Sequence, residues 1–531
     1  MAETRVRPGG EEAAELLRRV GSPLYVYDAE EIGRRYRTRS RLGAAVGFLE
    51  QESLVVLLFA VYCVGLLVRL PTSLLSDSWM TLLYGRELWQ HGLPRVDHFM
   101  AWTDGRAWVD QQWLAQALFG GVAAFGGVKA ALLLHAALLG SALGLALAAA
   151  RRLGGTARSV PLVAAVALPA LIGDWVLRAQ SIAYVLFALL VWLLVADARA
   201  PSRRVLVALP LLALWANVHG SVVLAAGLVA LRGLTLLRTD RARGAALVVL
   251  PWACVFASPY GLGLVEYYRS LFLNPTLGMV VTEWAATTPS LMTAPFYILG
   301  FATVALVARR WRALSAYEHV MLMALLANGL LAVRNMVWFS VGALVVVPAL
   351  LDDVLHDSGG REAPLLVRRG LPLTALVATA VVTVAVAVRP SGWFEQRYPE
   401  EAARSVAVAA AGDPTLGVFA EPQYADWLVW RHPELRGRVA FDARLELLTP
   451  KQLVSVYFWR SHIGKRWDAT PGCRAIVLLN LPEEPFTETA LLRQRGTARI
   501  YRDRRISVLV RRQPRSICSG AAGSPLDEPT W

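Results

Sequence analysis

Long apolar segments recur along the chain between residues 53 and 388, separated by short polar segments that are rich in arginine. Most have about 15 to 22 residues, close to the length that an α-helix needs to cross a bilayer. We therefore predict an α-helical polytopic membrane protein with about eleven crossings. They cover residues 53–70, 128–150, 159–173, 180–196, 205–219, 221–237, 245–259, 294–309, 317–333, 336–351 and 370–388. Residues 112–127 are apolar but broken by glycine, and we expect an interfacial or re-entrant piece there.

The arginines between these segments predict the orientation of the chain. Counting from a basic N-terminal segment (residues 1–43) on the cytoplasmic side, every large arginine cluster falls inside, which is the usual bias of membrane proteins. These clusters are Arg199/Arg203/Arg204, Arg238/Arg241/Arg243, Arg309/Arg310/Arg312 and Arg361/Arg368/Arg369. No signal peptide is visible at the N-terminus. The transmembrane domain then covers residues 44–389, and everything after about Arg389 lies outside.

The part of the chain after residue 389 has a different pattern. Short β-like runs (416–420, 438–442, 475–480, 498–501 and 506–511) alternate with helical patterns at about 423–431, 450–460 and 484–494. This alternation predicts a small extracytoplasmic α/β domain over residues 390–515. The last residues, 516–531, have the composition of a disordered tail.

Composition and charge exclude other classes of protein. Of the 531 residues, 56% are hydrophobic and only 18% are charged, whereas a soluble protein carries about 25% charged residues. The net charge of +14 comes from arginines in the short loops and does not indicate a nucleic-acid surface. The four cysteines show no metal-binding spacing, although Cys473 and Cys518 could form a disulfide outside the membrane.

Residues 71–114, which we call the outer loop, are polar and lie between two apolar segments. The loop holds five acids and five tryptophans: Asp77, Glu87, Asp97, Asp104, Asp110, Trp79, Trp89, Trp102, Trp108 and Trp113. Tryptophan favours the membrane–water boundary, and carboxylates beside a bilayer serve either solubility or chemistry. We interpret this loop as half of an active site.

Further polar residues fall on the same outer side of the predicted topology. They are Asp174, Arg178, Trp215, Asn217, His219, Tyr260, Glu283, Trp284, Arg334 and Asn335. Ionisable residues at membrane depth are costly and tend to face a cavity. Carboxylates can act as a general base or hold a divalent cation, and arginines can hold a phosphate. The combination predicts a lipid-linked sugar phosphate as the substrate.

Several motifs resemble bacterial multi-spanning membrane proteins related to the GT-C glycosyltransferase superfamily. They are Asp77-x-Trp79, Gly85-Arg86, Pro94-x-x-Asp97-x-Phe99, Thr103-x-Gly105-Arg106-x-Trp108, Trp113-Leu114, WANVHGS at 215–221, SPYG at 258–261, TEW at 282–284, Arg334-Asn335 and Phe441-Asp442-x-Arg444. The resemblance runs over most of residues 53–512. It implies a GT-C-like fold in the bacterial plasma membrane and sugar transfer from a polyprenyl-phosphate donor to a cell-envelope glycan, lipid or protein. Thr81 stands where such proteins often have histidine, and Met100 where they have serine.

The resemblance and the topology together give each candidate residue a role. We expect Asp77, Asp97, Glu283 and His219 to be catalytic or to position the acceptor, and Arg178 and Arg334 to bind the donor phosphate. Trp79, Trp102, Asn217 and Tyr260 are expected to line the substrate site. Asp77 and Asp97 are also candidate ligands for a divalent cation, Mg or Mn.

Other interpretations of the same residues stay open. Asp77 could cap a helix, Asp97 could belong to a turn, and His219 could bond to a neighbouring span. For the whole chain, the alternatives are a lipid-linked sugar transporter or flippase and a non-catalytic envelope scaffold.

Overall fold

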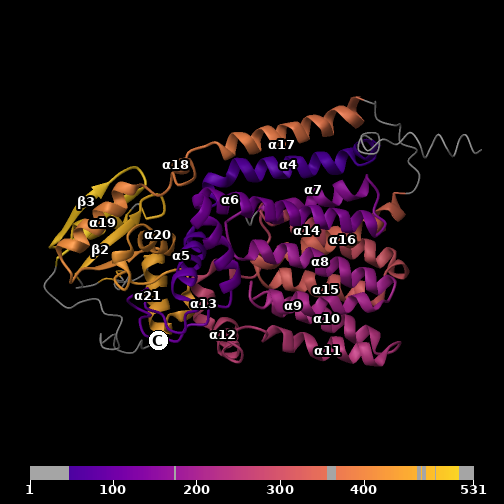
Figure 1. Ribbon diagram of the computed structural model, residues 1–531, viewed down its shortest axis with the longest axis horizontal. Coiled ribbons are helices and arrows are strands. Elements are labelled where there is room, and N and C mark those ends of the chain that lie inside the picture. The colour runs from indigo at the N-terminus through magenta and orange to yellow at the C-terminus, as the bar shows by residue number, and fades with distance from the viewer. Residues whose placement is uncertain are drawn as a thin grey trace, which may run out of the picture.

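The computed structural model describes residues 47–172, 175–355, 366–462, 468, 470, 474–484 and 486–512. The predicted basic segment, the C-terminal tail, Asp174 and the pair Cys473/Cys518 lie outside these residues. The described chain forms a bundle of apolar helices with a small α/β domain at one end (Figure 1).

The bundle consists of helices that correspond to the predicted crossings. They are α4 (Ser53–Arg69), α6 (Trp113–Arg152), α7 (Ser159–Ile172), α8 (Gln180–Arg199), α9 (Ala208–Trp215), α10 (Val222–Leu236), α11 (Arg241–Val255), α14 (Ala294–Arg309), α15 (Ala316–Leu331), α16 (Met336–Val354) and α17 (Leu371–Ala387). Within the described residues, five helices are long and apolar enough to cross a membrane, and α7, α10, α14 and α15 are shorter apolar helices. A polytopic helical membrane protein with a C-terminal α/β domain is thus confirmed.

Residues 113–126 form a helical arm of their own, separated from the following span by a kink, and whether this arm is interfacial or re-entrant stays a prediction. This arm and the span are together labelled α6, and they meet at Gly127, a residue with non-helical dihedral angles of φ 69° and ψ 179°. Such a positive φ is readily adopted only by glycine, which explains how two apolar arms can change direction at this residue.

Shorter elements connect the bundle to the α/β domain. The outer loop forms α5 (Ser76–His91), and the segment between α11 and α14 forms α12 (Gly263–Phe272), α13 (Pro275–Val280) and the 3₁₀ turn η3 (Thr282–Trp284). Another 3₁₀ turn, η5 (Val333–Asn335), precedes α16. α5 packs directly against the first arm of α6 at Gly85. The two backbones are so close that a Cβ added at Gly85 would lie 2.1 Å from the carbonyl oxygen of Gln116.

The α/β domain has a four-stranded sheet in the order β1-β2-β4-β3. The strands are β1 (Gly417–Ala420), β2 (Ala475–Asn480), β3 (Thr497–Arg502) and β4 (Ile506–Arg511), and the helices are α18 (Ser391–Phe394), α19 (Glu400–Gly412), α20 (Pro422–Arg431), α21 (Pro450–Ser461) and α22 (Thr487–Leu492). β1 and β2 are parallel, and the other two pairs are antiparallel. The predicted run at 438–442 forms only a bridge between Val439 and Val418.

Both faces of this sheet are covered, which accounts for the continuous apolar run of β2. Ile476 and Leu478 join a hydrophobic core with α19, α20 and α5, whereas Val477 and Leu479 join one with α21 and α22. Successive side chains of a strand point to opposite faces, so each residue of this run is buried on one side or the other. The first core contains residues of α5 and α6, so the domain is docked on the bundle.

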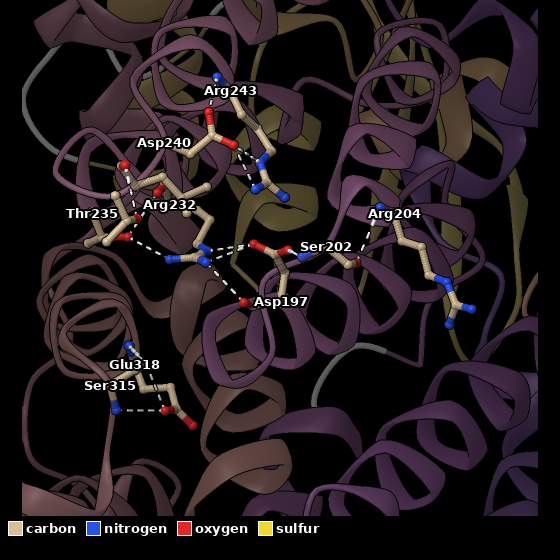
Figure 2. Close-up of polar contacts among 11 residues, drawn as sticks. Asp197, Ser202, Arg204, Arg232, Thr235, Asp240, Arg243, Ser315 and Glu318 are labelled. Carbon is tan, nitrogen blue, oxygen red and sulfur yellow. Dashed lines mark hydrogen bonds and ion pairs between the residues drawn. The ribbon is translucent and has the colours of Figure 1, made fainter.

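Polar contacts gather around the arginine-rich segments that follow α8 and α10 (Figure 2). Arg232 of α10 forms a buried ion pair at 2.8 Å with Asp197 of α8. Asp240 caps α11 by accepting the backbone N–H of Arg243, and the Ser315/Glu318 capping box begins α15. The ion pair joins α8 to α10, and the two caps fix the starts of α11 and α15, at the end that the arginine distribution predicts to be cytoplasmic.

Candidate functional site

A cavity of about 1000 Å³ lies where the bundle meets the α/β domain. Its walls come from the start of α5, the segment 178–180, the turn between α9 and α10, one face of α10, α12, η3, η5 and the domain segment 443–446. Five of the residues predicted from the sequence line this cavity: Asp77, Arg178, His219, Glu283 and Arg334. Residues up to 257 positions apart in the sequence therefore meet in one site.

Arg178 lies between two carboxylates of the cavity. Its Nε is 2.9 Å from Asp77 Oδ2, and its Nη1 and Nη2 donate hydrogen bonds of 3.1 and 2.8 Å to the two oxygens of Glu283. Burial alone would raise the pKa of the Glu283 carboxyl. The hydrogen bonds and charge of Arg178, with the charge of Arg334, outweigh this effect and hold that pKa below its usual value. Both Asp77 and Glu283 are therefore partly neutralised by one guanidinium.

The start of α5 explains how Asp77 is held. The helix begins at Ser76, so Asp77 lies in its first turn, where a negative charge is favoured by the helix dipole. Ser78, not Asp77, accepts the backbone N–H of Leu75 at this end. The Ser78 hydroxyl lies within hydrogen-bond distance of the carbonyl of Leu177, the residue before Arg178, which joins the two segments.

Arg334 is the second arginine of the cavity and has different surroundings. Its guanidinium lies 5.1 Å from the centre of the Trp284 ring. Among the residues that the structure describes, no carboxylate oxygen lies within ion-pair distance of it. Its positive charge is therefore available to an anion in the cavity.

His219 is held in one neutral form. The backbone N–H of Ser221 donates to Nδ1 at 3.1 Å, and the Ser221 hydroxyl lies 2.8 Å from the same nitrogen while accepting the indole N–H of Trp215. Since Nδ1 accepts a hydrogen bond, the proton is on Nε2. Burial, assisted by the charges of Arg334 and Arg178, lowers the pKa of His219 to about 3. The ring therefore offers an N–H donor and does not act as a general base at neutral pH.

Asp97 does not line the cavity. It is fully buried and accepts hydrogen bonds from the Phe99 backbone and the Thr103 hydroxyl, with Arg444 Nη2 3.1 Å from both of its oxygens. Arg444 also donates from Nε to Asp442 at 2.7 Å. The structure thus places Asp97 in a clamp that joins the outer loop to the α/β domain.

The four predicted substrate-lining residues also lie away from the cavity. Trp79 is buried against Tyr398, and the Trp102 ring stacks on Phe441. The remaining two hold loops together. Asn217 accepts the indole N–H of Trp113, and the Tyr260 hydroxyl donates to the carbonyl of Pro94.

The α/β domain contributes Pro422, Ala443, Arg444, Leu445, Glu446 and Arg460 to the cavity, and among these Glu446 had no clear signal in the sequence. Arg444 and Glu446 lie in the segment 443–446, more than 350 positions after Asp77. Burial raises the pKa of the Glu446 carboxyl to about 7, although the charge of Arg444 opposes this shift. The only indication was an acid placed between two apolar residues, Leu445 and Leu447.

The described residues do not fit the expected divalent-cation site. No group of three or more His, Cys, Asp or Glu side chains among them could hold a metal ion. The two candidate ligands are also separated by their partners, since Asp77 is bound to Arg178 and Asp97 to Arg444. We therefore derive no chemical step through a metal.

Comparisons with known proteins gave matches only at the level of three-dimensional structure. No family model and no curated protein matches the chain. Among solved structures, the chain is similar to ArnT from Cupriavidus metallidurans in the apo state, with 14% identity and a TM-score of 0.48, over 85% of this chain and 97% of that one. It is also similar to ArnT from the same organism bound to undecaprenyl phosphate, with 14% identity and a TM-score of 0.46, over 87% of this chain and 99% of that one. ArnT is a GT-C glycosyltransferase. The function proposed below rests on the residues of the cavity.

Proposed function

We propose that this protein is a membrane glycosyltransferase that moves a sugar from a polyprenyl-phosphate donor to a cell-envelope acceptor on the outer face of the bacterial plasma membrane. One observation carries the proposal. A single cavity brings the outer-loop carboxylate Asp77 together with Arg334, whose charge no described carboxylate neutralises, beside an apolar wall. This is the set of groups that a lipid-linked sugar phosphate requires.

The donor phosphate is assigned to Arg334. A guanidinium binds phosphate oxygens through charge-assisted hydrogen bonds, and the neutral His219 ring adds an N–H donor for an oxygen of the bound substrate. Arg178 is already shared by Asp77 and Glu283, so a phosphate would reach it only by displacing one of them. Arg178 therefore orders the two carboxylates and is the secondary phosphate ligand.

The polyprenyl chain is assigned to the apolar wall formed by α10 and α11. The cavity side of this wall consists of Leu224, Leu228, Leu231, Leu234 and Trp252. Burial of apolar surface stabilises by about 25 cal/mol per Å², so a long prenyl chain gains much of its affinity here.

Transfer requires attack of an acceptor hydroxyl on C1 of the sugar, opposite the phosphate. The C1–O bond to phosphate breaks as the new bond forms, and the anomeric centre is inverted. Arg334 stabilises the charge that develops on the leaving phosphate. Asp77 and Glu283 lie beside Arg178 and position the sugar and the acceptor.

The test uses the purified protein in lipid with a panel of polyprenyl-phosphate sugars, and follows release of free polyprenyl phosphate. We expect release by the wild type and its loss in Asp77→Asn and Arg334→Met. Asp104→Asn is the matched control, because Asp104 lies in the same loop with an exposed side chain, and its one ion pair within the described residues is with His98. Loss of release in EDTA with recovery in Mg or Mn would instead show that a metal takes part.

Donor binding or translocation without release from any sugar would contradict the transferase. That result would favour the lipid-linked sugar transporter, or the scaffold if binding is absent as well.

A further inference from the structure

The segment that carries Glu446 is held rigidly at the edge of the cavity. Glu446 is the middle residue of the 3₁₀ turn η8 (Leu445–Leu447). Arg106 of the outer loop donates to the carbonyl of Leu447, and Arg444 is bound to Asp97 and Asp442. Since Arg444 before it and Leu447 after it are bound to other segments, the backbone of Glu446 is held at the edge of the cavity that its side chain lines.

Glu446 differs from the other cavity carboxylates in its partners. Asp77 and Glu283 are both paired with Arg178, whereas Glu446 has no ion pair or side-chain hydrogen bond within the described part of the chain. A carboxylate that is paired with arginine holds protons weakly, and one that is buried without such a partner holds them more strongly. The proton affinity of Glu446 is therefore closer to that of a general base at neutral pH.

The charged and titratable groups around Glu446 come from four parts of the chain. Arg444 and Asp442 belong to its own segment, Asp77 to α5, and Tyr267 to α12, while Asp110 precedes α6. Arg444 lowers the pKa of Glu446, and burial with the acids Asp442 and Asp77 raises it, to about 7. Arg444 itself is already bound to two other carboxylates, Asp97 and Asp442.

We propose that Glu446 of the α/β domain is a further catalytic residue, which takes the proton from the acceptor hydroxyl during sugar transfer. This inference rests on the proposed function. The Glu446 carboxylate accepts the proton, the acceptor oxygen forms its bond to C1, and the electron pair of the breaking C1–O bond goes to the phosphate oxygen. The products are the glycosylated acceptor, polyprenyl phosphate and protonated Glu446, which returns its proton to water. Asp77 then has a positioning role.

The experiment measures the pH dependence of transfer from a polyprenyl-phosphate sugar, between pH 5 and 9, by full-length protein in lipid. The hydroxyl acceptor is supplied as glycerol and as an envelope lipid extract. For the wild type, kcat/KM should rise about tenfold per pH unit below about pH 7 and then level off. In Glu446→Gln, kcat should fall by about 10²- to 10⁴-fold and the rise should disappear, while the KM for the donor is unchanged. Glu446→Asp should recover part of the rate and the pH dependence.

The matched control is Asp110→Asn. Burial raises the pKa of Asp110 to about 7 as well, but Asp110 does not line the cavity, so this variant should keep the rise, with its midpoint moved slightly to lower pH because a neighbouring negative charge is lost. If Asp110→Asn loses the rise, or if Glu446→Gln keeps both its rate and the rise, Glu446 is not the base. A wild type that releases no lipid phosphate from any donor overturns the proposed function and, with it, this inference.

Discussion

Replacing Arg444 by methionine should weaken the docking of the α/β domain on the outer loop. Arg444 is bound to Asp97 of the loop and Asp442 of the domain, and its guanidinium lies 4.3 Å from the ring centres of Tyr84 and Trp108. Methionine fills a similar volume but leaves both carboxylates without their cation. The change therefore removes charge pairing with little loss of packing.

The size of the effect follows from burial. The side chains of Arg444, Asp97 and Asp442 are 3%, 0% and 4% exposed. Removing one partner of a buried pair costs about 3–5 kcal/mol, because the remaining charge stays uncompensated. This corresponds to roughly two to nearly four powers of ten in the ratio of docked to undocked forms. Arg436 is the matched control, since it joins the domain to Glu87 of α5 but is 39% exposed. A surface pair contributes about 0–1 kcal/mol.

The assay compares denaturant unfolding and protease cleavage of wild type, Arg444→Met and Arg436→Met in the same detergent. We expect Arg444→Met to lower the unfolding midpoint clearly and to expose residues 437–440, whose backbone bonds to the outer loop at Phe99, Ala101 and Trp102. Adding Asp97→Asn to Arg444→Met should restore part of the loss, because the amide needs no cation. Equal losses in the two arginine variants, or no recovery in the double variant, would refute the reasoning.

Three further predictions concern other parts of the molecule. Gly85→Ala should destabilise α5 by about 1–3 kcal/mol, because the new methyl would lie 2.1 Å from a carbonyl oxygen of α6, whereas Gly65→Ala has open space and should leave the thermal unfolding unchanged. Burial and two nearby arginines lower the pKa of His219 from 6.5 to about 3. The unfolded chain therefore binds the extra proton between these values, stability falls as the pH is lowered through this window, and His219→Gln should show a shallower fall in denaturation at pH 4 to 7. Asp197→Ala should cost about 3–5 kcal/mol by stranding the buried Arg232, and a double variant that also carries Arg232→Met should recover stability; no recovery would contradict this account.

Much of the bundle could be predicted because a bilayer leaves an apolar segment few alternatives. A buried apolar run must satisfy its own backbone hydrogen bonds, so residues 180–196 or 336–351 have to be helical. The glycines of 112–127 indicated a break before the following span, and the kink at Gly127 lies there; the direction of the arm could not be predicted, because hydropathy does not report dihedral angles. The run at 438–442 was predicted as a strand, yet its long-range backbone bonds are divided between Val418 of β1 and the outer-loop residues Ala101 and Trp102, and such pairing leaves no local pattern.

The candidate site was predictable where polarity and topology coincide. Arg178 and Arg334 lie at the ends of apolar segments and Glu283 in the loop between two of them, all on one predicted side, and they meet for that reason. Asp97 is also an acid on the predicted outer side, but its carboxylate binds Arg444 in the interface with the α/β domain and does not line the cavity. Glu446 could not be identified, because its position depends on how the last quarter of the chain docks on the first.

The bond between Asp97 and Arg444 joins residues that are 347 positions apart. During synthesis the outer loop leaves the ribosome early, and its buried carboxylate has no cation until nearly the whole chain has been made. A prematurely ended chain would keep its membrane helices but lack the partner for this loop. The cavity is therefore complete only when the α/β domain has been translated and has docked. Truncated copies should be inserted in the membrane, and quality-control proteases should recognise them by the outer loop that lacks its partner domain.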